Sequence, residues 1–161
     1  MWGIQTSKHT LNNCSSPAVL ERNKQRHDKI LVNLSNWIKS HLKAEAKLFV
    51  DLPQHGYLPT SHVFNNFRPD IAVYHDKMIH ILELTIPHET NLKNSCDYKS
   101  SKYANLAQNL TQDFRSVSTV NVHTVEVSSL GLISEFNKFC KATMTVNKLD
   151  HFDIKNLQEF F

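Results

Sequence analysis

Two acidic residues, Asp70 and Glu83, have the types and the spacing that could support metal chemistry. Glu83 lies in a run rich in Ile and Leu, where a charge is costly to bury unless something binds it. Carboxylates on adjacent strands can hold a divalent cation such as Mg²⁺ or Mn²⁺, which polarises a phosphate and activates water. The pair therefore predicts metal-dependent hydrolysis of phosphodiesters.

A hairpin is expected to position this pair. The runs 68–74 and 78–86 read as two strands joined by a short polar turn, so they should pair antiparallel. If the turn has a two-residue loop, Asp70 lies directly opposite Glu83 on one face of the sheet. A slip of one residue in the strand pairing would place the two acids on opposite faces of the sheet. The predicted metal site therefore depends on this register.

The following helix is expected to bring a positive charge to the same place. An apolar stripe recurs along it at helical spacing: Leu92, Cys96, Tyr103, Leu106 and Leu110. Lys99 falls on the stripe, and Lys102 lies at its edge. An inward lysine needs an anionic partner, and it can stabilise charge on a reacting phosphate. The backbone carbonyl of Leu84 could complete the metal shell.

The hydrophobic periodicity predicts an α/β fold with a mixed four-stranded sheet flanked by helices. A helix over 18–43 precedes strands at 47–52, 68–74 and 78–86, and a crossover helix to about 112 precedes a strand at 121–128. This αβββαβ order is followed by a shorter helix at 134–143. We expect a loose arm at 1–17, one domain at 18–145 and a tail with a short helix at 146–161.

Taken together, these motifs resemble the PD-(D/E)XK restriction-like nuclease superfamily, and most closely the endonuclease domain of non-LTR retrotransposons. The resemblance covers roughly residues 22–130 and rests on four groups: Arg26-His27-Asp28, Arg68-Pro69-Asp70, Glu83-Leu84-Thr85-Ile86-Pro87, and Lys99 with Lys102-Tyr103. The superfamily's usual lysine, two residues after the acid, is replaced here by Thr85. The catalytic role of that lysine would then fall to Lys99 or Lys102 of the following helix.

This resemblance implies a restriction-endonuclease-like core and a retrotransposon-derived DNA endonuclease. Asp70 and Glu83 would bind Mg²⁺ or Mn²⁺ with the Leu84 carbonyl, and Lys99 or Lys102 would assist catalysis. Arg68, Lys93 and Lys102 would contact the DNA backbone, giving salt-sensitive binding. Cleavage of both strands would need a homodimer or sequential nicks. The resemblance also places His27, Asp28 and Tyr103 at the rim of the site.

Structural alternatives exist for the same residues. Asp70 could be a strand-edge carboxylate paired with Arg68, and Glu83 could form a buried ion pair with Lys99. His27 could pack on the core from its helix, and Tyr103 could be a core residue. Under these alternatives the chain would be an inactive DNA-binding or protein-interaction relic of the same fold.

Composition narrows the function classes. The 161 residues include three glycines and no Gly-rich phosphate loop, so we expect no organic cofactor. A net charge of +3 is compatible with nucleic acid. Three cysteines without a CxxC pair suggest a reducing compartment. No run is long and apolar enough for a membrane span, and the first residues do not resemble a signal peptide. We therefore expect a nuclear or cytoplasmic protein.

Overall fold

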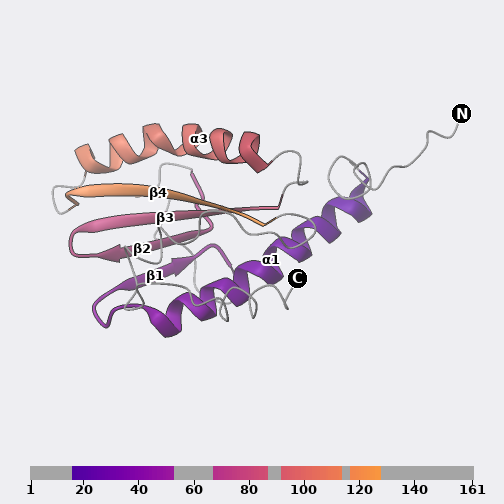
Figure 1. The fold of residues 1–161 in the computed structure, drawn as a ribbon, viewed down its shortest axis with the longest axis horizontal. Coiled ribbons are helices and arrows are strands. Elements are labelled where there is room, and N and C mark those ends of the chain that lie inside the picture. Colours follow the sequence, from indigo (N-terminus) through magenta and orange to yellow (C-terminus); the bar gives the residue numbers. More distant parts are fainter. Residues whose placement is uncertain (1–15, 53–66, 87–91, 114–116, 128–161) are drawn as a thin grey trace, which may run out of the picture.

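The computed structural model describes residues 16–52, 67–86, 92–113 and 117–127 (Figure 1). Several predicted segments lie outside the described residues: most of the N-terminal arm, the loop at 54–66, the first residues of the crossover helix, the helix at 134–143 and the tail at 146–161.

Six elements form the described fold. They are α1 (Pro17–His41), β1 (Lys47–Val50), β2 (Ile71–His75), β3 (Met78–Thr85), α3 (Leu92–Asp113) and β4 (Thr119–Glu126). The predicted order is confirmed, but some ends differ. Pro17, expected in the arm, begins α1 after the N-cap Ser16, because proline suits the first helical position, where no backbone donor is needed. β2 begins at Ile71, after Pro69, which cannot donate to a strand ladder.

The strands form one sheet in the order β1-β2-β3-β4. β1 and β3 each pair antiparallel with β2, and β4 pairs parallel with β3. A parallel neighbour requires a crossover, and α3 lies in that connection. The predicted mixed four-stranded sheet is therefore confirmed.

The register of the β2–β3 hairpin also agrees with the prediction. His75 faces Met78, and the pairing continues to Ile71 opposite Leu82. Asp76 and Lys77 form the two-residue connection with φ angles of 50° and 61°. Two successive left-handed residues are typical of a tight turn whose twist matches that of the paired strands. One step beyond the last pair, the register places Asp70 opposite Glu83.

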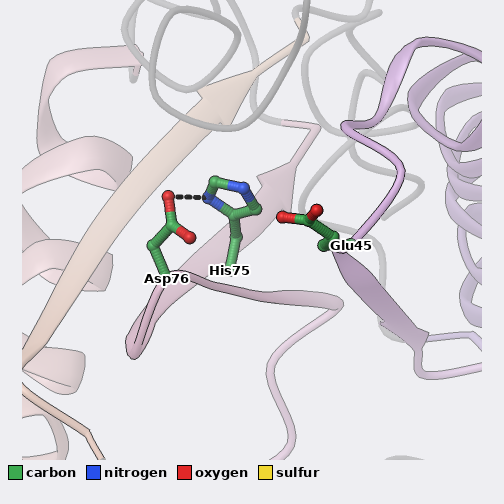
Figure 2. A group of neighbouring side chains, drawn as sticks. All are labelled: Glu45, His75 and Asp76. Carbon is green, nitrogen blue, oxygen red and sulfur yellow. Dashed lines mark ion pairs between the residues drawn. The ribbon is translucent and has the colours of Figure 1, made fainter.

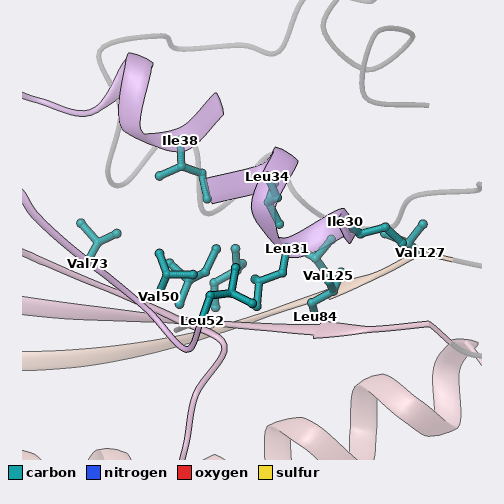
Figure 3. Close-up of a cluster of buried hydrophobic side chains, with 12 residues drawn as sticks. Ile30, Leu31, Leu34, Ile38, Val50, Leu52, Val73, Leu84, Val125 and Val127 are labelled. Atoms are coloured by element: carbon teal, nitrogen blue, oxygen red, sulfur yellow. The ribbon is translucent and has the colours of Figure 1, made fainter. Parts of the chain in front are cut away.

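α1 and α3 cover opposite faces of the sheet (Figure 1), and a separate hydrophobic core lies under each helix. The core between α1 and the sheet is drawn in Figure 3 and contains Ile30, Leu31, Leu34, Ile38, Val50, Leu52, Ile71, Val73, Leu82, Leu84, Val125 and Val127. The core on the α3 side contains Ala72, Ile79, Ile81, Tyr103, Leu106 and Val117. Because strand side chains alternate between faces, Glu83 shares the α3 side with Ile79 and Ile81.

The two described helices lack membrane-spanning character. Within the described ranges, neither α1 nor α3 combines the length and apolar composition needed to cross a bilayer.

Candidate metal and nucleic-acid site

Asp70 is held where β2 begins, at a point where three segments meet. Its carbonyl accepts a hydrogen bond from the Asp51 amide at 2.9 Å, which fixes the backbone against the end of β1. Its carboxylate Oδ2 accepts from the Leu84 amide at 2.8 Å. The other oxygen, Oδ1, lies 3.5 Å from Nε2 of His27 on α1. The carboxylate is thus oriented by β3 and by α1.

Glu83 lies beside Asp70 and is almost completely buried. Its side chain is 1% exposed, and Oε2 pairs with Nζ of Lys99 at 2.5 Å. Its other oxygen, Oε1, accepts a hydrogen bond from the Asp70 amide at 3.2 Å. The structure therefore brings Asp70, Glu83 and Lys99 together, from the start of β2, from β3 and from α3.

Tyr103 closes the α3 side of this group. The residue is fully buried, and its hydroxyl donates to the Arg68 carbonyl at 3.4 Å. Burial, together with the hydrogen bond and charge of Glu83, raises the pKa of Tyr103 well above its usual value. The phenol therefore stays protonated and acts as a donor beside the carboxylate.

Lys102 lies against Tyr103, one residue along α3 from it. Its Nζ is 3.3 Å from the Tyr103 hydroxyl and 4.8 Å from the ring centroid. Lys102 is exposed. Of the two helix lysines that the sequence offered, Lys99 is the one that reaches an acid of the pair.

The site is richer in negative than in positive charge. Burial and then the charge of Asp70 raise the pKa of Glu83, and Lys99 and Tyr103 offset this increase only in part. Two carboxylates facing one ammonium leave an excess negative charge when both are ionised. A cation near the pair would therefore favour the ionised forms.

His27 supplies part of the missing positive charge. Burial alone would lower its pKa, but hydrogen bonds and charges from Asp70 and Asp28 outweigh burial and raise the pKa. The ring is 28% exposed and lies 3.4 Å from Asp28 Oδ1 through its second nitrogen. Asp28 also pairs with Lys24 at 2.6 Å. Of the two residues expected at the rim, His27 thus lies next to Asp70, and Asp28 lies beside His27; neither belongs to the α1 core.

The remaining predicted residues are Arg68, Lys93 and Leu84. Arg68, expected to contact DNA, is 67% exposed and pairs with Asp51 Oδ1 at 2.6 Å. Lys93 is exposed on α3. The N–H and C=O of one strand residue point to the same edge. The Leu84 carbonyl therefore lies on the side of its amide, which binds Asp70.

The donor set fits a hard divalent cation. Mg²⁺ takes oxygen ligands and is commonly held by one or two carboxylates with several waters. Each carboxylate oxygen has more than one acceptor site, so the hydrogen bonds made by Asp70 and Glu83 leave lone pairs for a metal. Lys99 could remain paired with Glu83 while the cation offsets the charge of Asp70.

Sequence reasoning did not identify two features near the hairpin. Asp51 anchors both the Asp70 backbone and the Arg68 side chain; its place after an apolar strand run was an available signal. A second group, Glu45, His75 and Asp76, has ligand atoms within 4.8 Å of one another and could hold a metal ion. His75 and Asp76 are adjacent in the sequence, but Glu45 lies 30 residues before His75, so no sequence spacing indicates that the three come together.

Neither the protein-family models nor the curated proteins contain a match to this chain.

Proposed function

We propose that this protein is a metal-dependent DNA endonuclease with a restriction-endonuclease-like core, derived from a retrotransposon. The observation that carries the proposal is the meeting of Asp70, Glu83 and Lys99, with Glu83 buried and paired to Lys99. The order of strands and helices, the hairpin register and the excess negative charge support it. The resemblance of the motifs supplies the substrate class.

In this proposal each residue of the centre has a separate task. Asp70 and Glu83 hold Mg²⁺ or Mn²⁺, with the Leu84 carbonyl as a further oxygen ligand. A bound divalent cation supplies polarisation of the phosphate and a more acidic water. Lys99 orients the attacking water or stabilises the charge that develops on the phosphate. Tyr103 keeps Glu83 in place through its hydroxyl.

Exposed basic residues would bind the DNA backbone. Arg68 and Lys102 lie next to the centre, and Lys93 extends the positive surface along α3. Contacts to phosphates carry little sequence information and weaken as salt is added. We therefore propose a salt-sensitive interaction in which backbone geometry, more than base identity, positions the scissile bond. A homodimer would allow both strands to be cut in one encounter.

One observation favours a second candidate. The close pair between Glu83 and Lys99 is also what a purely structural ion pair would look like, with the lysine replacing a metal. In that case the chain is an inactive domain that binds DNA or protein through the same fold.

A plasmid-nicking assay with Mn²⁺ and Mg²⁺ tests the proposal. The wild type is compared with Asp70→Asn and Glu83→Gln, which preserve shape and remove charge, and with Asp97→Asn, an exposed carboxylate on α3, as the matched control. We expect both site variants to lose at least about 100-fold in nicking rate, since metal and acid–base functions each contribute at this level. The control should cut like the wild type.

Thermal unfolding with added metal separates the two candidates. A ligand that binds only the folded state raises its stability, so Mg²⁺ or Mn²⁺ should raise the Tm of the wild type but not of Glu83→Gln. An inactive relic would show no such shift while retaining salt-dependent DNA affinity. Equal nicking by all four proteins would refute the catalytic assignment.

A further inference from the structure

The turn end of the β2–β3 hairpin carries a second set of metal-ligating residues, far from Asp70 and Glu83. Glu45 lies in the connection between α1 and β1, His75 is the last residue of β2, and Asp76 is the first residue of the turn. Their potential ligand atoms all lie within 4.8 Å of one another. Figure 2 shows the imidazole between the two carboxylates.

The buried imidazole of His75 is the feature that indicates a binding site in this group. Its side chain is 5% exposed, and its Nδ1 is buried without a hydrogen-bond partner among the described residues. Asp76 Oδ2 lies 3.1 Å from that nitrogen but outside hydrogen-bonding geometry. Buried polar atoms of native proteins rarely lack a partner, and a bound ion accounts for some of those that do. A cation on the lone-pair axis of Nδ1 would satisfy it.

The carboxylates can reach the same cation. Asp76 is 64% exposed and Glu45 is exposed, so each can adjust its rotamer without repacking the core. The backbone of Asp76 is fixed by the tight turn, with φ at 50°, which keeps its carboxylate next to His75. Two carboxylates this close repel unless a positive charge lies between them. The site therefore combines the buried, fixed imidazole of His75 with two exposed carboxylates that can change rotamer.

The donor chemistry selects the class of metal. One imidazole nitrogen and two carboxylate oxygens are typical ligands of Zn²⁺, which binds histidine and carboxylates at about 2.0–2.2 Å. Mg²⁺ prefers an all-oxygen shell, so it should bind poorly here. Because two of the ligands are exposed, the remaining coordination positions would be taken by water.

We propose that Glu45, His75 and Asp76 form a zinc site that links the start of β1 to the β2–β3 turn. Asp76 lies six residues along the hairpin from Asp70, about 20 Å at about 3.3 Å per residue. The site is therefore independent of the proposed nuclease centre, and its role is to fix the hairpin end. Zinc binding should raise the Tm of the whole chain.

Zinc titration of the full chain against a chromogenic chelator tests this assignment, with ZnCl₂ as the probe and Tm as a second readout. The variants Glu45→Gln and Asp76→Asn change only exposed side chains, so they should fold. We expect each to weaken zinc affinity at least about tenfold, in line with the losses that follow when a metal site is disturbed, and to lower the Tm gain at a fixed zinc concentration. Glu83→Gln and Asp97→Asn serve as controls and should bind zinc like the wild type.

Two results would overturn the assignment of zinc to these residues, and a third would contradict the choice of metal. One is an unchanged zinc affinity in both Glu45→Gln and Asp76→Asn, which would place any bound zinc on other residues. The other is a loss of zinc binding in Glu83→Gln alone, which would assign the ion to the proposed nuclease centre. Competition by millimolar Mg²⁺ for the same ligands would contradict the choice of metal.

Discussion

Replacing Lys99 by methionine tests whether its ammonium compensates the buried charge of Glu83 in the proposed nuclease centre. The substitution keeps an unbranched side chain that is one atom shorter and removes the ammonium that pairs with Oε2 of Glu83. Breaking a buried ion pair from one side costs about 3–5 kcal/mol, because the other charge is left buried. Lys99 is 22% exposed, and Glu83 can take up a proton, so we expect a loss of about 2–4 kcal/mol at neutral pH without divalent cations.

Urea unfolding and calorimetry measure this loss. For a chain of this size, about 1 kcal/mol shifts Tm by about 2–4 °C, so Lys99→Met should unfold roughly 5–15 °C below the wild type. Lys93→Met is the matched control, since Lys93 is exposed on the same helix, and it should change stability by no more than about 0.5 kcal/mol.

A double-mutant cycle identifies the partner. In Glu83→Gln/Lys99→Met the buried charge is gone, so much of the lost stability should return, with a coupling energy of about 1.5–3 kcal/mol. Adding Mg²⁺ or Mn²⁺ should also raise the Tm of Lys99→Met more than that of the wild type, because the cation then supplies the only strong counter-charge to Glu83 within the centre as described. A loss below about 0.5 kcal/mol in Lys99→Met, as for an exposed pair, would refute this account of the centre.

Two further predictions concern the groups around the pair. The pKa of His27 is raised from 6.5, so its charge stabilises the folded state fully below pH 6.5, and this stabilisation is lost as pH rises through the raised pKa. In urea unfolding at a series of pH values, the advantage of the wild type over His27→Gln should therefore shrink with rising pH; parallel stability curves would contradict this. Tyr103→Phe removes the buried hydroxyl that donates to the Arg68 carbonyl and lowers the pKa of Glu83. The substitution should lower the free energy of unfolding by about 1 kcal/mol and raise the pKa of Glu83 further. Unchanged stability would show that the hydroxyl is dispensable.

The local pattern was sufficient to predict the hairpin that positions the acids. The pairing of His75 with Met78 follows from a two-residue turn between alternating strands, and side-chain alternation then places Asp70 opposite Glu83. The position of Lys99 could be predicted in the same way, because helical spacing places it on the apolar face of its helix. Each of these inferences needs only neighbouring residues and a fixed period.

Other contacts could not be predicted because they join distant segments. The amide of Leu84 binds Asp70, and no property of leucine indicates that role. His27 reaches Asp70 from a helix that packs on the other face of the sheet, which depends on how α1 crosses the strands. The cluster at Glu45, His75 and Asp76 also depends on how the α1–β1 connection meets the hairpin turn.

The left-handed turn at Asp76 and Lys77 has a consequence for how this chain can vary. Both residues adopt positive φ, so asparagine or glycine would be accepted there and would relieve the conformational penalty. Inserting or deleting one residue in the turn would be disruptive, because every side chain of β3 would then point to the opposite face of the sheet. Glu83 would then face α1 while Asp70 stayed in place. The backbone of this turn therefore tolerates substitution, although a change at Asp76 would remove a proposed zinc ligand, whereas a change in the length of the turn would separate the acid pair.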